Sequence, residues 1–293
     1  MSEVALSILI PTYNYTCFKL VSDLQIQAEN LGVDYEIIVA EDGSRSSVDI
    51  IANHKIVELS HCKHLILTNN VGRAAIRNRL AQESSGQYLL FIDADAKVIR
   101  SDFLQKYLEA AEHHPVVCGG MICPESCLDP NRQLRWLYEK EHESKVGINS
   151  RQFRSFSFLI NIDVAHKVCF DERFKLYGYE DVKYGKDLLD AGYQIHLIDN
   201  PLQINYFETN KVYLQKTEEA LRNAWQFHTE LAETVEIVRV AKKLRVFKPI
   251  ILLIFGIAKK SVKKNLLSSK PNLSLFGFYK LAFYMRLSFR TQN

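Results

Sequence analysis

The sequence lacks several features that would place it in a familiar class of protein. It contains neither the G-x-G-x-x-G fingerprint of a dinucleotide-binding fold nor a P-loop. The longest uncharged run near the C-terminus, PIILLIFGIA at residues 249–258, has ten residues, whereas a membrane-spanning helix needs about 18–20. No basic segment precedes the first apolar run, which begins at Val4, so we expect no secretory signal.

Cysteine is too sparse and too scattered to define a scaffold. The six cysteines form no paired motif, and Cys118, Cys123 and Cys127 lack the spacing and the neighbouring histidines of a zinc site. We therefore expect reduced thiols, as in cytosolic proteins.

Acidic residues are absent from the last part of the chain. Residues 239–293 contain 13 Lys and Arg and no Asp or Glu, which leaves 24 basic and 34 acidic residues in residues 1–238. The overall charge of +3 is therefore the sum of −10 in the first part and +13 in the second. This split predicts an acidic catalytic body over 1–238 and a basic C-terminal segment over 239–293 that meets an anionic surface.

Short apolar runs alternate with helix-length segments through the first 120 residues. This alternation predicts an α/β fold, with a mostly parallel sheet and helices on both of its faces. In such sheets, ligands bind at the carboxyl ends of the strands. The predicted strands cover 4–10, 35–40, 64–68, 88–92 and 116–120, and the predicted helices cover 16–31, 73–84 and 102–113.

The pattern changes after residue 120. Residues 121–150 contain a charged stretch that is either an exposed helix or a mobile connection. Beyond it we predict a strand over 155–162, a helix that ends near residue 191, a strand over 193–199 and a long helix over 211–236.

Polar motifs follow each of the first four predicted strands. Because parallel strands end at the same edge of a sheet, we expect these motifs to lie close together. They are PTYN (Pro11–Asn14), EDGS (Glu41–Ser44), NNVGRAAIRN (Asn69–Asn78) and DAD (Asp93–Asp95).

Two aspartates, Asp93 and Asp95, directly follow the apolar run YLLFI. In an extended chain they would face the same side, about 6–7 Å apart. Because burying carboxylates without partners is costly, we expect a positive group between them. The simpler alternative is a solvated turn or a helix cap at the end of the strand.

In series, the four motifs resemble those of glycosyltransferase family 2, and the resemblance covers roughly residues 4–235. It implies an inverting, hexosyltransferase-type enzyme with the GT-A fold that uses a nucleotide sugar as donor. It also implies that Asp93 and Asp95 bind Mn²⁺ or Mg²⁺, which bridges the diphosphate of the donor.

The resemblance further implies a nucleotide pocket. Asp42 would bind the pyrimidine base, although a turn aspartate before Gly43 is the alternative. Arg73 and Arg77 lie one helical turn apart and are expected to reach the diphosphate, unless they form a solvated helix face. The residues predicted to bind the nucleotide are Pro11, Thr12, Tyr13, Asn14, Glu41, Asp42, Asn70, Gly72, Arg73, Arg77 and Asp93.

A later motif, YGYEDVKYGKDLLDAGY at 177–193, resembles the segment that supplies the catalytic base in this family. An inverting transfer needs one carboxylate to remove the proton of the acceptor hydroxyl. The resemblance implies that Asp181 is this base and that Glu180 binds acceptor hydroxyls. The alternative is an ordinary helix N-terminus, where acidic residues are favoured.

The chain departs from the family in one respect. Many members carry a histidine, as a further metal ligand, shortly after the strand that here ends at Asp199. This chain has none between His196 and His228, so the position is taken by Asn205 or by no residue. A metal held by fewer protein groups should bind weakly in the absence of nucleotide.

The basic segment has an amphipathic pattern. Cationic amphipathic segments with aromatic residues typically lie in a membrane surface. The alternatives are a helical arm that packs on the body or on a second subunit, and nucleic acid, which we do not expect because no binding module accompanies the charge. Lys259, Lys260, Lys263 and Lys264 cluster on one helical face, and Ile251, Ile254, Ala258, Val262 and Leu266 mostly share the other.

Taken together, these features predict a metal-dependent inverting glycosyltransferase of polysaccharide biosynthesis. It would be cytoplasmic and peripheral on the inner face of the cell membrane. It would move a sugar from a nucleotide sugar to a hydroxyl of a glycan or of a lipid-linked oligosaccharide, and a UDP-sugar is the first candidate for the donor.

Two rival functions remain. A nucleotidyltransferase is disfavoured because PTYN is not the Gly-rich basic loop that such enzymes need. A non-catalytic partner, which binds nucleotide or membrane in a glycan-assembly complex, is disfavoured by the intact DAD and YED. The missing histidine leaves this second rival open.

Overall fold

The computed structural model of the protein describes residues 5–143 and 153–287. The chain forms two compact units. The first contains the residues up to Ile122, Val146–Lys175 and Tyr184–Tyr206, and the second contains Cys123–Lys145, Leu176–Lys183 and the residues from Phe207 onward. The predicted boundary between a catalytic body and a basic segment at residue 238 stays a prediction.

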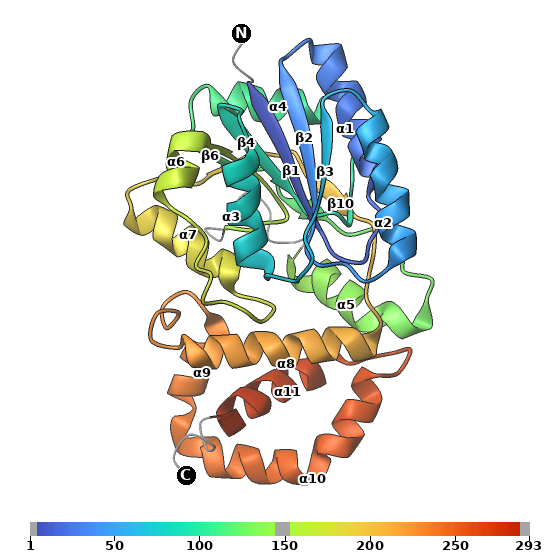
Figure 1. The fold of residues 1–293 in the computed structure, drawn as a ribbon. Coiled ribbons are helices and arrows are strands. Elements are labelled where there is room, and N and C mark those ends of the chain that lie inside the picture. The colour runs from blue at the N-terminus through green and yellow to red at the C-terminus, as the bar shows by residue number, and fades with distance from the viewer. Residues whose placement is uncertain (1–4, 144–152, 288–293) are drawn as a thin grey trace. The chain divides into compact units, whose positions relative to one another are not determined.

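The first unit is built on a seven-stranded sheet (Figure 1). The strand order is β3-β2-β1-β4-β8-β6-β9, and only β8 runs antiparallel to its neighbours. The predicted mostly parallel α/β sheet is thus confirmed. Its strands are β1 (Leu6–Thr12), β2 (Tyr35–Glu41), β3 (Cys62–Ile66), β4 (Tyr88–Ile92), β6 (Val116–Cys118), β8 (Ser157–Asn161) and β9 (His196–Leu197).

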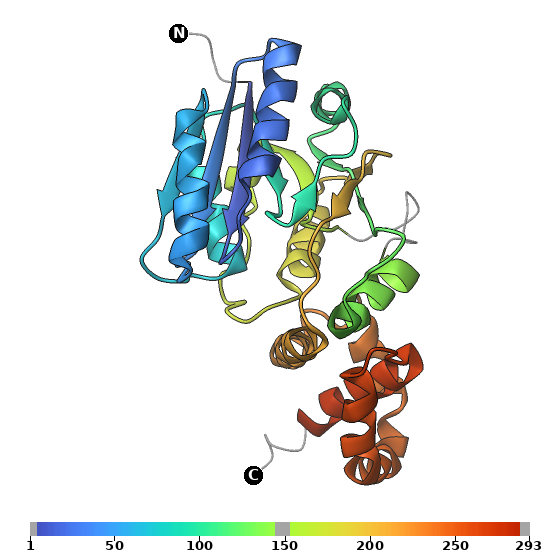
Figure 2. The same ribbon diagram turned by 90° about the vertical axis from the view of Figure 1, so that its right-hand side faces the viewer.

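Both faces of this sheet are apolar, because β1, β2 and β4 are buried almost throughout and alternate side chains point to opposite faces. On one face, a core cluster joins strand residues such as Leu9 and Phe91 to three helices, α3 (Arg73–Glu83), α6 (Ile162–Lys167) and α7 (Glu180–Asp190). Helices α1 (Phe18–Leu31) and α4 (Phe103–Ala111) pack on each other and contact β2, β6 and β8; Figure 2 shows helices on both faces of the sheet.

A second sheet has three strands, and its strand β5 (Ala96–Lys97) directly follows the DAD motif. The strand order is β5, β10 (Leu202–Ile204) and β7 (Met121–Ile122). Because β10 runs antiparallel to β5, with Ile204 opposite Ala96, it brings residue 205 beside residue 95.

The second unit is helical. Its central helix is α11 (Leu273–Leu287), which contacts α5 (Gln133–Tyr138), α8 (Asn210–Gln226), α9 (Glu236–Lys243) and α10 (Lys248–Leu266). The buried face of α11 is largely aromatic, and the hydroxyl of Tyr279 donates to Glu218 on α8 at 2.6 Å. Helix α11, which belongs to the basic segment, is therefore part of the core of this unit.

Several predicted boundaries were wrong. The predicted helix over 211–236 ends at Gln226, where Phe227 leaves the helical conformation, and α9 begins only at Glu236. Helix α2 (Ser47–His54) was missed, although Ser46 caps it by accepting from the N–H of Asp49. The remaining short elements are η1 (Lys55–Glu58), η2 (Pro130–Arg132), η3 (Glu139–Glu143) and η4 (Arg245–Phe247).

The charged stretch over 121–150 lies only partly within the described residues. The described part of this range forms β7, η2, α5 and η3, so the helix alternative applies there, although the helix is short. The predicted strand over 193–199 reduces to the two residues of β9.

Candidate active site

Asn14 joins the loops that follow β1 and β2. Its side-chain oxygen accepts from the N–H groups of Arg45 and Ser46 at 2.7 and 2.9 Å, and its own N–H donates to Ser44 at 2.9 Å. Asn14 adopts a positive φ of 49°, which asparagine tolerates better than most residues. The first two motifs therefore form one hydrogen-bonded surface, as their strand positions predicted. Of their residues, Tyr13 is exposed and Thr12 is buried.

Glu41 is fully buried beneath this surface. Its carboxylate accepts from Asn53 at 2.7 Å and from Ser44, and it lies 3.4 Å from Nε2 of His64. Burial alone would raise the pKa of Glu41, but the hydrogen bonds from His64, Asn53 and Ser44 outweigh it and lower the pKa. The geometry supports a role in holding Ser44 and its loop, and a direct contact between Glu41 and a nucleotide stays a prediction.

Asp42 ties the second motif to the third. Its carboxylate accepts from the N–H groups of Val71 and Gly72 at 2.7 and 3.1 Å, and its carbonyl accepts from the side chain of Asn70 at 2.9 Å. Burial raises the pKa of Asp42, and the two N–H donors offset part of that rise.

Gly43 allows this approach of the two loops. It has a φ of +66°, and a Cβ at this position would lie 2.2 Å from the backbone nitrogen of Asn70. No residue with a side chain fits there without moving the backbone. Gly72, with a φ of +95°, then leads directly into α3.

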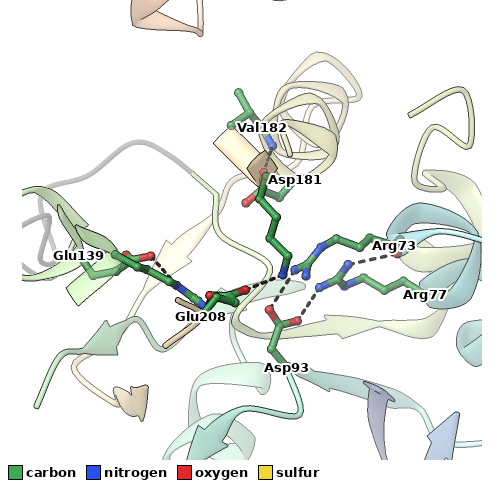
Figure 3. Close-up of polar contacts among 9 residues, drawn as sticks. Arg73, Arg77, Asp93, Glu139, Asp181, Val182 and Glu208 are labelled. Carbon is green, nitrogen blue, oxygen red and sulfur yellow. Dashed lines mark hydrogen bonds and ion pairs between the residues drawn. The ribbon is translucent and has the colours of Figure 1, made fainter. Parts of the chain in front are cut away.

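Asp93 lies at the end of β4 and pairs with two arginines from the first two turns of α3 (Figure 3). Arg73 donates to one carboxylate oxygen at 3.0 Å, and Arg77 donates to the other at 2.5 Å. Burial alone would raise the pKa of Asp93, but the charges and hydrogen bonds of Arg73 and Arg77 lower it. The structure thus places two side chains of the third motif on Asp93, and a positive group between Asp93 and Asp95 stays a prediction.

The two arginines differ in their surroundings. The side chain of Arg77 is 1% exposed, donates to the carbonyl of Arg73 at 3.1 Å and lies over the ring of Phe170, 5.6 Å from its centroid. The side chain of Arg73 is 38% exposed. Arg77 is therefore fixed within the core, whereas Arg73 can also contact a ligand.

Asp95 does not continue the strand. The expected extended geometry is wrong, because β4 ends at Ile92 and residues 94–95 form a turn that the N–H of Ala96 closes on the carbonyl of Asp93 at 3.1 Å. The N–H of Asn205 donates to the carbonyl of Asp95 at 2.8 Å. The Asn205 side chain also lies 3.4 Å from the hydroxyl of Tyr15.

The binding of a divalent cation by Asp93 and Asp95 stays a prediction. Among the described residues, no cluster of three or more His, Cys, Asp or Glu side chains is placed to hold a metal. The carboxylate of Asp93 pairs with Arg73 and Arg77, and Asp95 is half-buried beside Asn205. One carboxylate with an amide nearby fits a hard cation that takes most of its ligands from phosphate oxygens and water.

The YED motif belongs to the second unit. Glu180 is buried at the start of α7, whereas Asp181 is half-buried and accepts from the N–H of Val182 at 2.8 Å (Figure 3). The loop before α7 is held by Asn223, whose side-chain amide donates to the carbonyls of Leu176 and Gly178 at 2.9 and 3.0 Å. The two acidic residues thus have different surroundings, and their roles stay predictions.

Four supporting residues were not predicted. Three of them hold the loops that follow β1 and β2, namely Asn53, His64 and Tyr15. The carbonyl of Tyr15 accepts from the side chains of Asn53 and Thr12, both at 2.9 Å. The fourth is Asn223 on α8. All lie outside the motifs, and an isolated asparagine in a helix gives no signal in a single sequence.

Comparison with known proteins agrees with this architecture. The profile of "Glycosyl transferase family 2" matches residues 7–170. A Haemophilus influenzae protein described as an "Uncharacterized glycosyltransferase" is 31% identical over 190 residues, which are 63% of this chain and 69% of that protein.

Two solved structures share the fold. S. aureus TarS 1–349 in complex with UDP has a TM-score of 0.50 at 14% identity, over 99% of this chain and 92% of that chain. GalNAc-T7 with UDP, GalNAc and Mn²⁺ has a TM-score of 0.53 at 14% identity, over 70% of this chain and 43% of that chain. The chain spans 39% of a longer TarS chain that it also matches.

The protein is therefore a glycosyltransferase: its chain belongs to glycosyl transferase family 2. The resemblance seen in the motifs is confirmed, and so is the GT-A type of fold.

Proposed function

We propose that the enzyme transfers a sugar with inversion from a nucleotide sugar to a hydroxyl of a lipid-linked or polysaccharide acceptor. The first candidate for the donor is a UDP-sugar. The observation that carries the donor half of this proposal is the pairing of Asp93 with Arg73 and Arg77 at the start of α3. An arginine held at a helix N-terminus is well suited to bind a diphosphate. The UDP bound to TarS and to GalNAc-T7 supports the choice of UDP.

The loops of the first unit supply the nucleotide contacts. Asp42 is held in place by the N–H groups of Val71 and Gly72, and each of its oxygens retains a lone pair for the imino N–H of a pyrimidine. Arg73 is the arginine with solvent access, so it binds the diphosphate, while Arg77 keeps Asp93 and Arg73 in position. Tyr13 is exposed beside the same loops and can cover the base.

Asp95, with Asn205 beside it, would hold Mn²⁺ or Mg²⁺. When bound, such an ion neutralises charge on the departing diphosphate. The Mn²⁺ in GalNAc-T7 supports this proposal. Because the chain offers few ligands, affinity for the ion should depend strongly on nucleotide.

The chemical step needs a base. We assign it to Asp181, whose carboxylate takes the proton of the acceptor hydroxyl as that oxygen bonds to the anomeric carbon. The bond from this carbon to the diphosphate oxygen breaks, the nucleotide leaves as the diphosphate, and the configuration inverts. Glu180, which is buried at the start of the same helix, binds hydroxyls of the acceptor and so orients it.

The test is release of nucleoside diphosphate from a panel of nucleotide sugars, with slow donor hydrolysis as the readout. We expect divalent-cation-dependent release from one donor, a loss of at least about 100-fold in Asp181→Asn with donor binding retained, and a loss of cation dependence in Asp95→Asn. Binding without turnover on any donor, even with membrane glycolipids present, would contradict the proposal. Asp163→Asn, which changes an exposed carboxylate away from the site, is the matched control.

A further inference from the structure

An uncovered apolar stripe runs along η4 and α10 in the second unit. Its side chains are between 48% and 79% exposed, although each is large and apolar. Those within α10 fall on an arc of about 100° of the helix surface. The apolar stripe consists of Val246, Phe247, Ile250, Leu253, Ile254 and Ile257.

The opposite side of α10 explains why this stripe is not part of the core. Phe255, Val262 and Leu266 are the buried residues of the helix, and the ring of Phe255 packs against Tyr279 of α11 at 5.5 Å between centroids. Of the residues predicted to form the apolar face of the segment, Val262 and Leu266 lie in the protein interior, whereas Ile254 belongs to the apolar stripe. The apolar stripe is a second apolar face on the same helix.

Basic residues border the stripe at both ends. Lys242, Lys243 and Arg245 precede it, and all three are exposed. Lys260, Lys263 and Lys264 follow it and are also exposed. No Asp or Glu occurs anywhere in residues 239–293. The surface therefore combines an apolar centre with positive charge on both flanks.

We propose that the apolar stripe inserts into the interfacial layer of an anionic lipid bilayer, with its flanking lysines and Arg245 on the lipid phosphates. Large aliphatic and aromatic side chains with cationic flanks are the composition of a helix that lies in a membrane surface. Among the described residues, none of the helices combines the length and the hydropathy of a membrane span.

A second copy of the chain is the poorer occupant. Pairing this surface with itself would bring at least six positive charges from each copy together, with no acidic residue of the segment to oppose them. An anionic lipid surface, such as the inner leaflet of the cell membrane, is complementary to it in both charge and polarity.

The first test is flotation of the full chain with phosphatidylcholine vesicles, with and without phosphatidylglycerol. We expect binding only to the anionic vesicles. Ile250→Ser/Ile257→Ser should lower the partition coefficient at least about tenfold. Val48→Ser/Ile51→Ser, which changes two equally exposed residues of α2, is the matched control and should bind like the wild type. Circular dichroism would verify that both variants fold.

The second test concerns the charge. Each lysine near an anionic surface contributes about a fivefold gain in binding, so Lys260→Gln/Lys264→Gln should weaken vesicle binding roughly 25-fold. Lys19→Gln/Lys55→Gln, at two exposed lysines of the first unit, should leave binding unchanged.

Three results would overturn the proposal. They are no binding of the wild type to anionic vesicles, equal binding by Ile250→Ser/Ile257→Ser, and a dimer in sedimentation velocity that the same variant dissociates. The last result would assign the apolar stripe to self-association. None of these measurements depends on sugar transfer, so they fail or succeed independently of the proposed reaction.

Discussion

The guanidinium of Arg77 donates to the carboxylate of Asp93 at 2.5 Å, at the end of β4 in the first unit. Because the side chain of Arg77 is 1% exposed and that of Asp93 is 17% exposed, solvent screens this pair less than a surface ion pair. It fixes the first turns of α3 to the end of β4 and so determines where Arg73 lies.

Removing Arg77 should therefore destabilise the fold. We predict that Arg77→Met lowers the free energy of unfolding by up to about 3–5 kcal/mol, because Asp93 is left as a largely buried charge with one partner fewer. Arg79→Met, at an exposed pair with Glu83 on the same helix, should cost about 1 kcal/mol or less. Urea denaturation of the two variants measures the difference. Equal losses in the free energy of unfolding would show that the Arg77–Asp93 pair stabilises the fold no more than the exposed pair does.

The loop contact at Gly43 gives a second prediction. Gly43→Ala should destabilise the protein by several kcal/mol and weaken UDP binding, because the new Cβ would lie 2.2 Å from the backbone of Asn70. Gly32→Ala is the matched control, since Gly32 has a φ of +64° but nothing within 4 Å of its Cβ position. That variant should lose only about 1–2 kcal/mol, the cost of the left-handed conformation. Thermal unfolding and calorimetry with UDP measure both effects.

Glu208 in the second unit predicts a pH dependence of stability. Burial would raise its pKa, but Arg135 and Lys216 outweigh this effect and lower the pKa to about 2. A carboxyl whose pKa is lower in the folded than in the unfolded state stabilises the fold above its unfolded pKa and loses that contribution as the pH falls through its folded pKa.

The free energy of unfolding should therefore fall between about pH 4.5 and pH 2. Glu208→Gln should be less stable at pH 7 and should show a smaller fall over this window. Denaturation curves at several pH values measure this dependence. A variant that retains the full wild-type slope would assign the fall to other carboxyls.

Much of the fold followed from the sequence because a parallel sheet imposes strong local patterns. The apolar runs of β1, β2 and β4 are buried on both faces, so each reads as a continuous strand followed by a polar motif. The convergence of the motifs at one edge followed from this topology, and the Asn14 and Asp42 contacts show it.

The partners of individual side chains did not follow. A positive group was expected between Asp93 and Asp95. The arginines that pair with Asp93 depend on how α3 packs, which brings in residues that lie 16 and 20 positions earlier in the chain. The turn after Asp93 was only the alternative interpretation, because DADA carries no glycine or proline. On α10 the sequence showed the amphipathic pattern, but only the packing of α11 reveals which apolar side chains remain exposed.

The most direct measurement of the central claim is calorimetric titration with UDP in the presence of Mn²⁺. The account predicts that wild type and Arg79→Met bind UDP with equal affinity, and that Arg73→Met binds at least about tenfold more weakly while keeping its stability within about 1 kcal/mol. Equal affinity in Arg73→Met, or no UDP binding by the wild type, would contradict a donor site at the start of α3.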